Sequence, residues 1–547
     1  MSNDELVQSL PWRETVGSNP THNMNTKLFS LAALSFMTLS AYAQETYENT
    51  NLIDNDLNGT ARYVGMGGAM DALGADISTI GTNPAGIGLF RKSQVTGSFG
   101  LVSQQDVENF SPGHKTTVSF DQIGFVFAKR SGRNSYVNFA FNYHKSKNFN
   151  QILAASDRLD GASQNKLSYI KLRSGLLYEL DKEGFPDEGK TCITNNQLDY
   201  LYYNNFIKYG NDYGYYESTA YDFNKATRGY IGEYDLNVSG NINDRVYLGL
   251  TVGIHDVHYK GYSEYCEQFA PNIDNIGQLA VVDDREITGT GFDVKAGVIF
   301  RPVEDSPFRI GVSVATPTWY DLTTTNYTYM TDGNAAPDNG EAYDFKLYTP
   351  WKFGLSLGHT VGNFLAIGAG YEYADYTSMD TRVIDGGYYD TWYGTYYEES
   401  SSDKNMNRHT ERTLKGVSTV KLGLEFKPDP MLAIRFGYNY VSPLFEKNGY
   451  KDGTISSEGS YYASSTDYVN WESTNRVTCG IGYNVGKFSF DVAYQYSAQN
   501  GNFHPFLDSY GDFDNPDGTV ESIDNYADAV KVSNKRHQLL FTLGYKF

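Results

Sequence analysis

The feature that most constrains this chain is the alternation of apolar and polar side chains over segments of ten or more residues. In RVYLGLTVGIH (245–255), Val, Leu, Leu, Val and Ile stand at alternate positions, and Tyr, Gly, Thr, Gly and His stand between them. A period of two puts the two sets on opposite faces of a β-strand. The same pattern recurs in MLAIRFGYNYV (431–441) and in FSFDVAYQY (488–496). The chain is therefore predicted to be all-β, with one apolar face on each strand.

The two faces differ in a way that indicates a membrane. The apolar faces repeatedly end in Tyr or Phe, which are amphipathic rings suited to a membrane interface. The opposite faces carry Gly, Ser, Thr, Asn and occasional charges, which are too polar for the core of a sandwich. A transmembrane β-barrel places such a face toward a wet lumen and the apolar face toward the lipid bilayer.

The alternating segments number fourteen, an even count that suits an antiparallel barrel. The connections after even-numbered strands are short, and those after odd-numbered strands are longer, up to the segment 150–228. Short turns on one side and long loops on the other are the pattern of outer-membrane barrels. The predicted strands are 93–105, 116–129, 135–149, 229–240, 245–259, 284–301, 307–322, 342–359, 363–378, 409–426, 431–446, 473–484, 487–499 and 535–547.

The N-terminal residues read as an export signal. Residues 24–43 contain a Lys, an apolar core and an Ala-x-Ala end, as a secretory signal peptide does. Residues 1–23 have no place before such a signal, so we interpret them as a mis-assigned upstream extension. The mature protein is expected to begin at Gln44.

Composition excludes some classes of function. The net charge of −21 argues against nucleic acid as a partner. The three cysteines show no metal-type spacing. Cys192 and Cys266 could form a disulfide in an exported protein, but sequence leaves that open.

Residues 61–90, ARYVGMGGAMDALGADISTIGTNPAGIGLF, resemble the N-terminal hatch of the FadL-type outer-membrane transporters of hydrophobic compounds. The match includes the motif Asn83-Pro84-Ala85, which Gly86 follows. Residues 289–302, 371–380 and 423–445 resemble the middle and late strands of that family. The resemblance implies a monomeric barrel (93–547) that is plugged by its N-terminal segment (44–92).

The third predicted strand departs from the family pattern. In the family, an inward kink of this strand opens the barrel wall sideways. Residues 135–149 contain neither Gly nor Pro, so the sequence predicts no bulge there and puts lateral release in doubt.

The hatch motif is expected to form the joint between plug and wall. Pro84 fixes its own φ and biases Asn83 away from the helical region. The Asn83 side chain can bond nearby backbone N–H groups.

Several polar side chains are predicted to face the lumen. One interpretation is a structural ion-pair network that holds the plug; the other is that an Arg binds a ligand carboxylate. The candidates are Gln122, His144, His255, Arg309, Glu372, Arg435 and Asp491.

Two motifs resemble a catalytic or a metal-binding pattern, but both are explained better as parts of regular strands. Ser356 lies in a G-x-S-x-G match, but the surrounding pattern is a strand with no helix after it. His255 and His258 would fall on opposite faces of one strand, so they would not share an ion. We therefore predict no catalytic residues, no metal and no cofactor.

The predicted function is passive outer-membrane transport of a small hydrophobic ligand, such as a long-chain fatty acid or an aromatic compound. Two alternatives stay open. One is a hemin receptor that uses His255, His258 and the loop tyrosines. The other is a surface adhesion or structural barrel whose Tyr-rich outer loops bind a partner.

Overall fold

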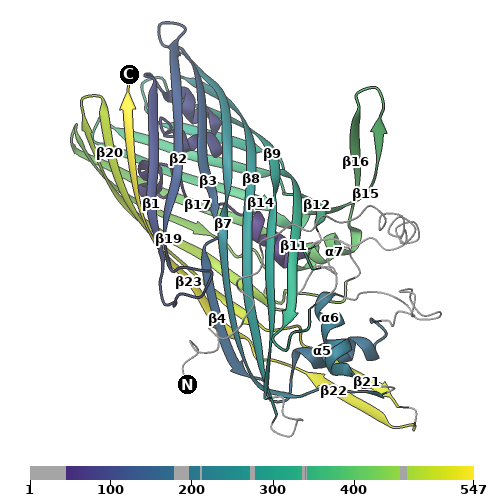
Figure 1. Cartoon of the computed structure of the whole chain (residues 1–547). Helices are drawn as coiled ribbons and strands as arrows, with labels where there is room; N and C mark the ends of the chain where they lie inside the picture. The colour runs from purple at the N-terminus through teal and green to yellow at the C-terminus, as the bar shows by residue number, and fades with distance from the viewer. Residues whose placement is uncertain are drawn as a thin grey trace, which may run out of the picture. The chain divides into compact units, whose positions relative to one another are not determined.

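The protein was analysed as a computed structural model that describes residues 45–177, 196–209, 212–270, 277–335, 339–340, 342–455, 465–515 and 517–547. In these residues, antiparallel strands form one closed ring with fourteen positions (Figure 1). The ring closes because β1 pairs with β23, from Gln94 opposite Lys546 to Gln104 opposite Arg536. The predicted barrel and its strand number are confirmed.

Ten positions of the ring are filled by single strands and the other four by two consecutive strands. In chain order, the ring is β1 (Gln94–Gln104), β2 (Thr116–Arg130), β3 (Tyr136–Asn148) with β4 (Gln151–Arg158), β7 (Ser218–Ile242), β8 (Val246–Phe269), β9 (Gln278–Phe300), β10 (Arg309–Ala315) with β11 (Trp319–Met330), β12 (Tyr343–Tyr348) with β13 (Lys352–Val361), β14 (Leu365–Asp375) with β15 (Asp380–Asp390), β17 (Gly416–Asp429), β18 (Leu432–Val441), β19 (Tyr468–Val485), β20 (Phe488–His504) and β23 (Val530–Lys546).

The outer surface of the ring is apolar, as a membrane-spanning barrel requires. Along much of the ring, large apolar residues at alternate positions are exposed, while the residues between them are buried or polar. Exposed residues of this kind include Phe99, Phe125, Leu250, Phe353, Leu424, Phe436, Val477, Ile481 and Phe490. In the described part of the chain, no helix is long and apolar enough to cross a membrane.

Several predicted boundaries were wrong, mostly at the outer end, where β8 runs to Phe269 instead of 259 and β20 to His504 instead of 499. Residues 150–228 are not one loop, because β4 occupies Gln151–Arg158 and β7 begins at Ser218. β7 pairs with β8 from Ser218 to Ile242, well beyond the length that a bilayer needs, and β4 pairs with the outer part of β7 over Gln151–Arg158. Residues predicted to start a strand at 409 belong to helix α7 (Lys404–Thr413), which Asp403 caps by accepting from the backbone N–H groups of Asn405 and Met406.

The connections follow the predicted alternation. Short turns join β2 to β3, β7 to β8, β13 to β14, β17 to β18 and β19 to β20. The long connections at the other end carry α5 (Gln164–Arg173), α6 (Gln197–Tyr202), α7, the hairpin of β15 with β16 (Thr395–Ser402), and the hairpin of β21 (Ser509–Asp514) with β22 (Val520–Asn525). We call this end the outer end.

The N-terminal segment fills the inside of the ring. Its elements are α3 (Thr46–Asn49), η1 (Thr50–Leu52), α4 (Ala61–Gly65), η2 (Ile77–Gly81) and η3 (Pro84–Leu89), drawn in purple in Figure 1. They contact strands on both sides of the ring, α4 with β18, β19 and β20, and η3 with β7, β8 and β9. We call residues 45–90 the hatch. The predicted signal peptide, the extension 1–23 and Cys192 lie outside the described residues, so those predictions and the Cys192–Cys266 pairing stay untested.

Candidate functional site: the lumen and its hatch

Four glycines on neighbouring strands seat the hatch against the wall. Gly358, Gly368, Gly423 and Gly437 lie directly opposite one another across β13, β14, β17 and β18. A Cβ at Gly358 would lie 3.0 Å from the backbone nitrogen of Leu73, and at the other three it would overlap backbone atoms of hatch residues 66–69. This glycine belt lets the hatch backbone lie directly on the strands.

The Asn-Pro-Ala motif has a similar seat on the opposite wall. Asn83 is buried, and its side chain accepts a hydrogen bond from the backbone N–H of Ala85 at 3.2 Å, with Pro84 opening η3. Gly249 and Gly297, which are opposite each other on β8 and β9, make room for Pro84 and for the Asn83 amide. Gly86 is packed against Thr79, where a Cβ would not fit.

An ion-pair network joins the hatch to the wall. The Arg62 side chain of the hatch donates to Glu425 of β17 through Nε at 3.0 Å and Nη2 at 3.2 Å. Glu425 also accepts from Arg435 Nε at 2.7 Å, and Arg435 Nη1 donates to Asp491 at 2.6 Å. Arg435 and Glu425 are almost completely buried. Arg435 and Asp491 are thus placed as expected for a structural ion-pair network that holds the plug.

A cavity of about 310 Å³ lies between the hatch and the wall. Of the seven candidate lumen residues, His144, His255 and Glu372 line it. Gln122 is buried and bonds Thr96 and Asn142, and Arg309 donates from Nη1 to the Leu73 carbonyl of the hatch at 2.8 Å. All seven side chains are on the inner side, but the cavity does not gather them into one site.

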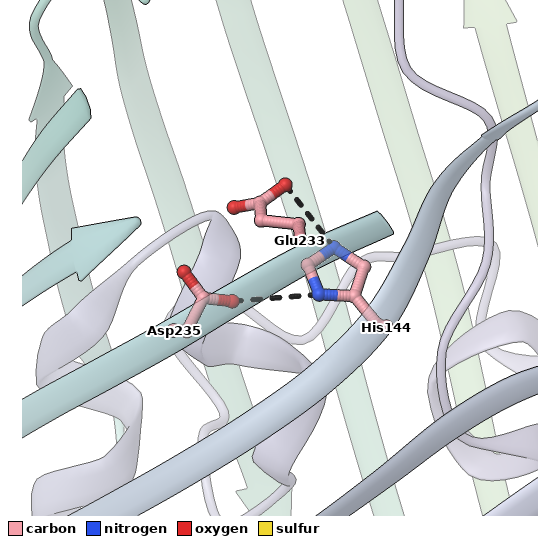
Figure 2. Close-up of side chains that lie close together, drawn as sticks. All are labelled: His144, Glu233 and Asp235. Atoms are coloured by element: carbon pink, nitrogen blue, oxygen red, sulfur yellow. Dashed lines mark ion pairs between the residues drawn. The ribbon is translucent and has the colours of Figure 1, made fainter. Parts of the chain in front are cut away.

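The cavity wall holds a dense cluster of ionisable side chains on β3, β7, β8 and β9. His144, Glu233 and His255 are opposite one another in the sheet, and Asp235 and Asp293 lie two residues along. Figure 2 shows the imidazole of His144 between two carboxylates, with Nε2 3.4 Å from Glu233 Oε2 and Nδ1 3.4 Å from Asp235 Oδ2. His255 Nε2 is 3.0 Å from Asp293 Oδ2, and its Nδ1 is 3.9 Å from Glu233 Oε2.

Lys295 supplies the positive charge of this cluster. Its Nζ contacts Glu233 Oε1, and it lies 3.1 Å from Asp293 Oδ1 and 3.4 Å from Asp235 Oδ1. Lysine therefore takes one oxygen of each carboxylate, and the other oxygens face the imidazoles. Sequence reasoning missed Glu233, Asp235, Asp293 and Lys295, although each occupies a lumen-side position in its alternating strand.

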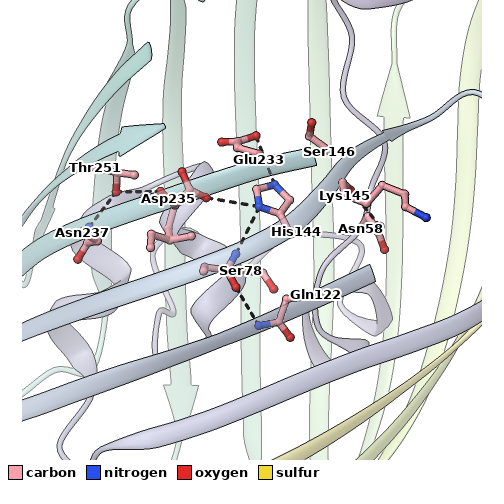
Figure 3. A network of polar contacts seen from close by, with 12 residues as sticks. Asn58, Ser78, Gln122, His144, Lys145, Ser146, Glu233, Asp235, Asn237 and Thr251 are labelled. Atoms are coloured by element: carbon pink, nitrogen blue, oxygen red, sulfur yellow. Dashed lines mark hydrogen bonds and ion pairs between the residues drawn. The ribbon is translucent and has the colours of Figure 1, made fainter. Parts of the chain in front are cut away.

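Polar neighbours extend the cluster along the wall and up to the hatch. Figure 3 shows Gln122, Asn237 and Thr251 around His144, with Ser78 of the hatch nearby. The Asn142 amide links Gln122 to His144, at 2.8 Å and 3.3 Å. Thr251 donates to the Ile80 carbonyl at 3.1 Å, and Gly81 leaves space beside the His144 ring. The hatch turn 78–82 thus rests on this cluster.

A second charged group lies at another part of the cavity, around Asp56 of the hatch. Asp56 accepts from the Asn148 backbone N–H at 2.9 Å and lies 4.0 Å from Arg476. Lys147 pairs with Asp54, and Arg536 donates to the Asn148 carbonyl at 3.3 Å. The Arg536 Nε is buried and has no hydrogen-bond partner among the described residues. This end of the cavity has more cations than anions.

The first hatch residues are anchored among the outer loops. The Tyr47 ring stacks on Phe445 at 4.8 Å, and its hydroxyl donates to Asn470 at 2.7 Å. Glu45 is buried and lies 4.0 Å from Lys451. Burial raises the pKa of Glu45 to about 7, although Lys451 acts in the opposite direction. The hatch therefore extends from the outer loops down to the short-turn end.

The expectation of an unbulged third strand was wrong. The register of β3 on β7 shifts between Lys145 and Lys147, and β2 stops pairing with β3 at Gln122 and His144. The extra residue, Ser146, is held by the hatch, because the Asp56 N–H donates to its carbonyl at 2.8 Å. A hydrogen bond from the hatch stabilises this bulge in a segment without Gly or Pro.

Beyond the bulge, the chain turns inward and leaves one side of β2 open. Gln104 of β1 bonds both backbone groups of Ile152 in β4, each at 2.8 Å. Residues 116–120 of β2 pair only with β1, and Asp121 is the extra residue at a register shift of that pairing. Side chains alone span the opening, such as Lys145 to Ser119 at 2.7 Å and Asn150 to Thr117 at 3.3 Å. We call it the β2–β3 gap.

The two rejected motifs have the predicted placement. His255 is buried on the lumen side, and His258 is exposed beside Asp256, so the pair does not face one ligand. Ser356 lies inside β13 and its hydroxyl points to the Gly311 carbonyl at 3.4 Å.

No protein-family model matches the chain, and no curated protein matches it. Among solved structures, it is similar to the toluene transporter TbuX of Ralstonia pickettii, at 12% identity and a TM-score of 0.44 over 90% of this chain and 99% of that one. It is also similar to a FadL homologue of Pseudomonas aeruginosa, at 12% identity and a TM-score of 0.47 over 90% and 100% of the two chains. A third is the toluene transporter TodX of Pseudomonas putida, at 11% identity and a TM-score of 0.42 over 90% and 99%.

Proposed function

We propose that this protein is an outer-membrane channel for small hydrophobic compounds, which enter at the outer loops and leave through the β2–β3 gap. One observation carries this proposal. The cavity inside the ring is lined by Asp121 on one side of the gap and by Ser146, Lys147 and Phe149 on the other. A path from the lumen to the lipid side has to displace the side chains that bridge the gap, including Asn58 of the hatch, which donates to Asp121 and to the Lys145 carbonyl at 3.0 Å each.

The lining of the cavity points to an amphipathic ligand. Phe149, Tyr259, Tyr320 and Phe445 offer apolar contacts. Lys147, Arg476 and Arg536 lie at one part of the lining and suit an acidic head group. A fatty acid or an aromatic acid satisfies both parts, whereas a neutral hydrocarbon uses only the first.

Uptake measurements test this function. Cells that lack the protein and cells that regain it are given a radiolabelled long-chain fatty acid, toluene and, as a control, a small sugar. The proposal expects the protein to raise uptake of the fatty acid most and of the sugar not at all. Equal uptake of all three in both cell types would contradict it.

A second candidate, surface binding of a partner, is favoured by the β15–β16 hairpin. Tyr388, Tyr389, Trp392, Tyr393 and Tyr396 are all exposed on it, and Figure 1 shows the hairpin projecting from the wall. Large exposed aromatic patches commonly mark interaction sites. Replacing residues 386–398 by a short turn separates the two functions, because a channel keeps its uptake and an adhesin loses its binding.

A further inference from the structure

The cluster on β3, β7 and β8 has the arrangement of a metal site. Glu233 Oε2 faces two ring nitrogens, His144 Nε2 at 3.4 Å and His255 Nδ1 at 3.9 Å. Tetrahedral zinc, with bonds of about 2.0–2.2 Å to nitrogen and oxygen, holds its donor atoms about 3.4 Å apart. These separations are longer than a good hydrogen bond and close to those of two ligands on one ion.

The opposite side of each imidazole is backed by a carboxylate. His144 Nδ1 lies 3.4 Å from Asp235, and His255 Nε2 lies 3.0 Å from Asp293. Metal-binding histidines nearly always donate their second N–H to such a partner, which directs the other nitrogen to the ion. The Asn142 Nδ2 amide, an N–H donor, also lies 3.3 Å from His144 Nδ1, so donation from this ring nitrogen to Asp235 requires the Asn142 amide to rotate away.

A buried nitrogen atom without a hydrogen-bond partner and the net charge of the cluster also favour a bound metal ion. His255 is almost completely buried, and its Nδ1 has no hydrogen-bond partner among the described residues. Three carboxylates against the single ammonium of Lys295 leave two negative charges when both imidazoles are neutral. Buried charge of this kind needs compensation, and one divalent cation supplies it.

Lys295 does not occupy the ligand positions. It contacts Oε1 of Glu233 and Oδ1 of Asp235 and Asp293, and so leaves Glu233 Oε2 toward the two histidines. Two groups, His144–Glu233–Asp235 and Glu233–His255–Asp293, each bring one donor atom per residue within 4.8 Å. The proposed ligands His144, Glu233 and His255 are not themselves one of these groups, because the two imidazoles approach Glu233 from the strands on either side of β7; binding one shared ion therefore requires the two rings to move toward each other.

We propose that His144, His255 and Glu233 bind a divalent transition-metal ion, with Asp235 and Asp293 orienting the two histidines. Two nitrogens and one carboxylate oxygen suit zinc and its neighbours rather than calcium or magnesium. His144, Glu233, His255 and Asp293 line the cavity, which provides the entry path that such a site needs. Remaining coordination positions would face the hatch turn 78–82 or a ligand in the lumen.

Zinc binding to the full chain tests this proposal. The protein in detergent is stripped with a chelator and titrated with zinc chloride by calorimetry. About one ion should bind per chain, and cobalt should give the absorption of a low-symmetry site. His144→Ala and His255→Ala should each weaken zinc binding by more than about 10-fold, and Asp293→Asn by about 10–100-fold. Wild-type protein that binds no zinc would overturn the proposal.

A matched control lies on the same strand. His258 is exposed on the opposite face of β8, so His258→Ala should leave zinc affinity unchanged. Glu233→Gln keeps the shape of the side chain and should remove binding while the barrel remains resistant to unfolding by detergent at room temperature. If His258→Ala weakens binding as much as His255→Ala, or if Glu233→Gln retains it, zinc binds elsewhere and the proposal is wrong.

Discussion

Arg62 of the hatch and Glu425 of the barrel wall form a two-bond ion pair, with Nε to Oε2 at 3.0 Å and Nη2 to Oε1 at 3.2 Å. Glu425 also contacts Arg435, which in turn donates to Asp491, so two carboxylates and two guanidinium groups form one chain of ion pairs. Removing the Glu425 charge would leave the half-buried Arg62 without its partner on the wall and the buried Arg435 with Asp491 alone. The pair therefore connects the fold of the wall to the position of the hatch.

Glu425→Gln should destabilise the protein by about 3–5 kcal/mol, because breaking a buried pair leaves uncompensated charge. Denaturant unfolding in detergent measures the loss. Glu286→Gln is the control, since its pair with Lys260 is exposed and should be worth less than about 1 kcal/mol. Equal small effects of the two variants would show that the Arg62–Glu425 pair does not hold the hatch.

Gly437→Ala should lift the hatch from its seat. A Cβ there would overlap the Gly67 backbone nitrogen, and over-packing of this kind costs about 1–3 kcal/mol. We expect faster proteolysis of residues 61–75 and a larger single-channel conductance in planar bilayers. Gly97→Ala on β1 should change neither, because a Cβ there meets nothing closer than 4.0 Å.

The anchoring of the first hatch residues should weaken as the pH rises. The pKa of Glu45 is raised from 4.5 to about 7, so its contribution to stability is complete below about pH 4.5 and is lost as the pH passes about 7. Lys451, Arg285, Glu48 and Asp452 surround the carboxyl group. Hydrogen exchange of residues 46–53 should therefore be faster at pH 8 than at pH 5 after correction for the intrinsic rate. Glu45→Gln should remove the difference, and its persistence would assign the effect to another group.

The alternation of apolar and polar residues was sufficient to predict the barrel, because this period of two can be recognised within each strand by itself. It places Gly249, Thr251 and His255 on the lumen side without knowledge of any neighbour. The ionisable cluster depends instead on the register between strands, which places Glu233 opposite both His144 and His255. The sequence of one strand does not determine its register with another strand, so the cluster could not be predicted. The bulge at Ser146 was missed for a related reason, since the hatch residue Asp56 stabilises it and no local Gly or Pro marks it.

Helix α7 was predicted to be part of a strand, because the local sequence pattern there is misleading. Residues 409–413 continue the apparent strand pattern of 416–429, but Asp403 caps a helix whose Thr410 and His409 bond Thr46 of the hatch. A tertiary contact overrides the local preference there.

The central claim is that ligand leaves the lumen through the β2–β3 gap, and a reversible bridge across that gap tests it. Asn150 Nδ2 and Thr117 Oγ1 lie 3.3 Å apart, so these two positions face each other across the gap and are chosen for the cysteine pair. The control pair replaces Phe127 and Phe139, which are opposite each other where β2 and β3 are already hydrogen-bonded.

The decisive measurement is the rate of fatty-acid uptake by cells carrying Thr117→Cys with Asn150→Cys, before and after a reductant. We predict that uptake is at least about 10-fold lower when the bridge is oxidised, returns on reduction, and is unaffected by the control pair; such a change corresponds to about 1.4 kcal/mol in the barrier. Uptake that is equal in the oxidised and reduced states, with the bridge shown to have formed, would contradict passage through the gap.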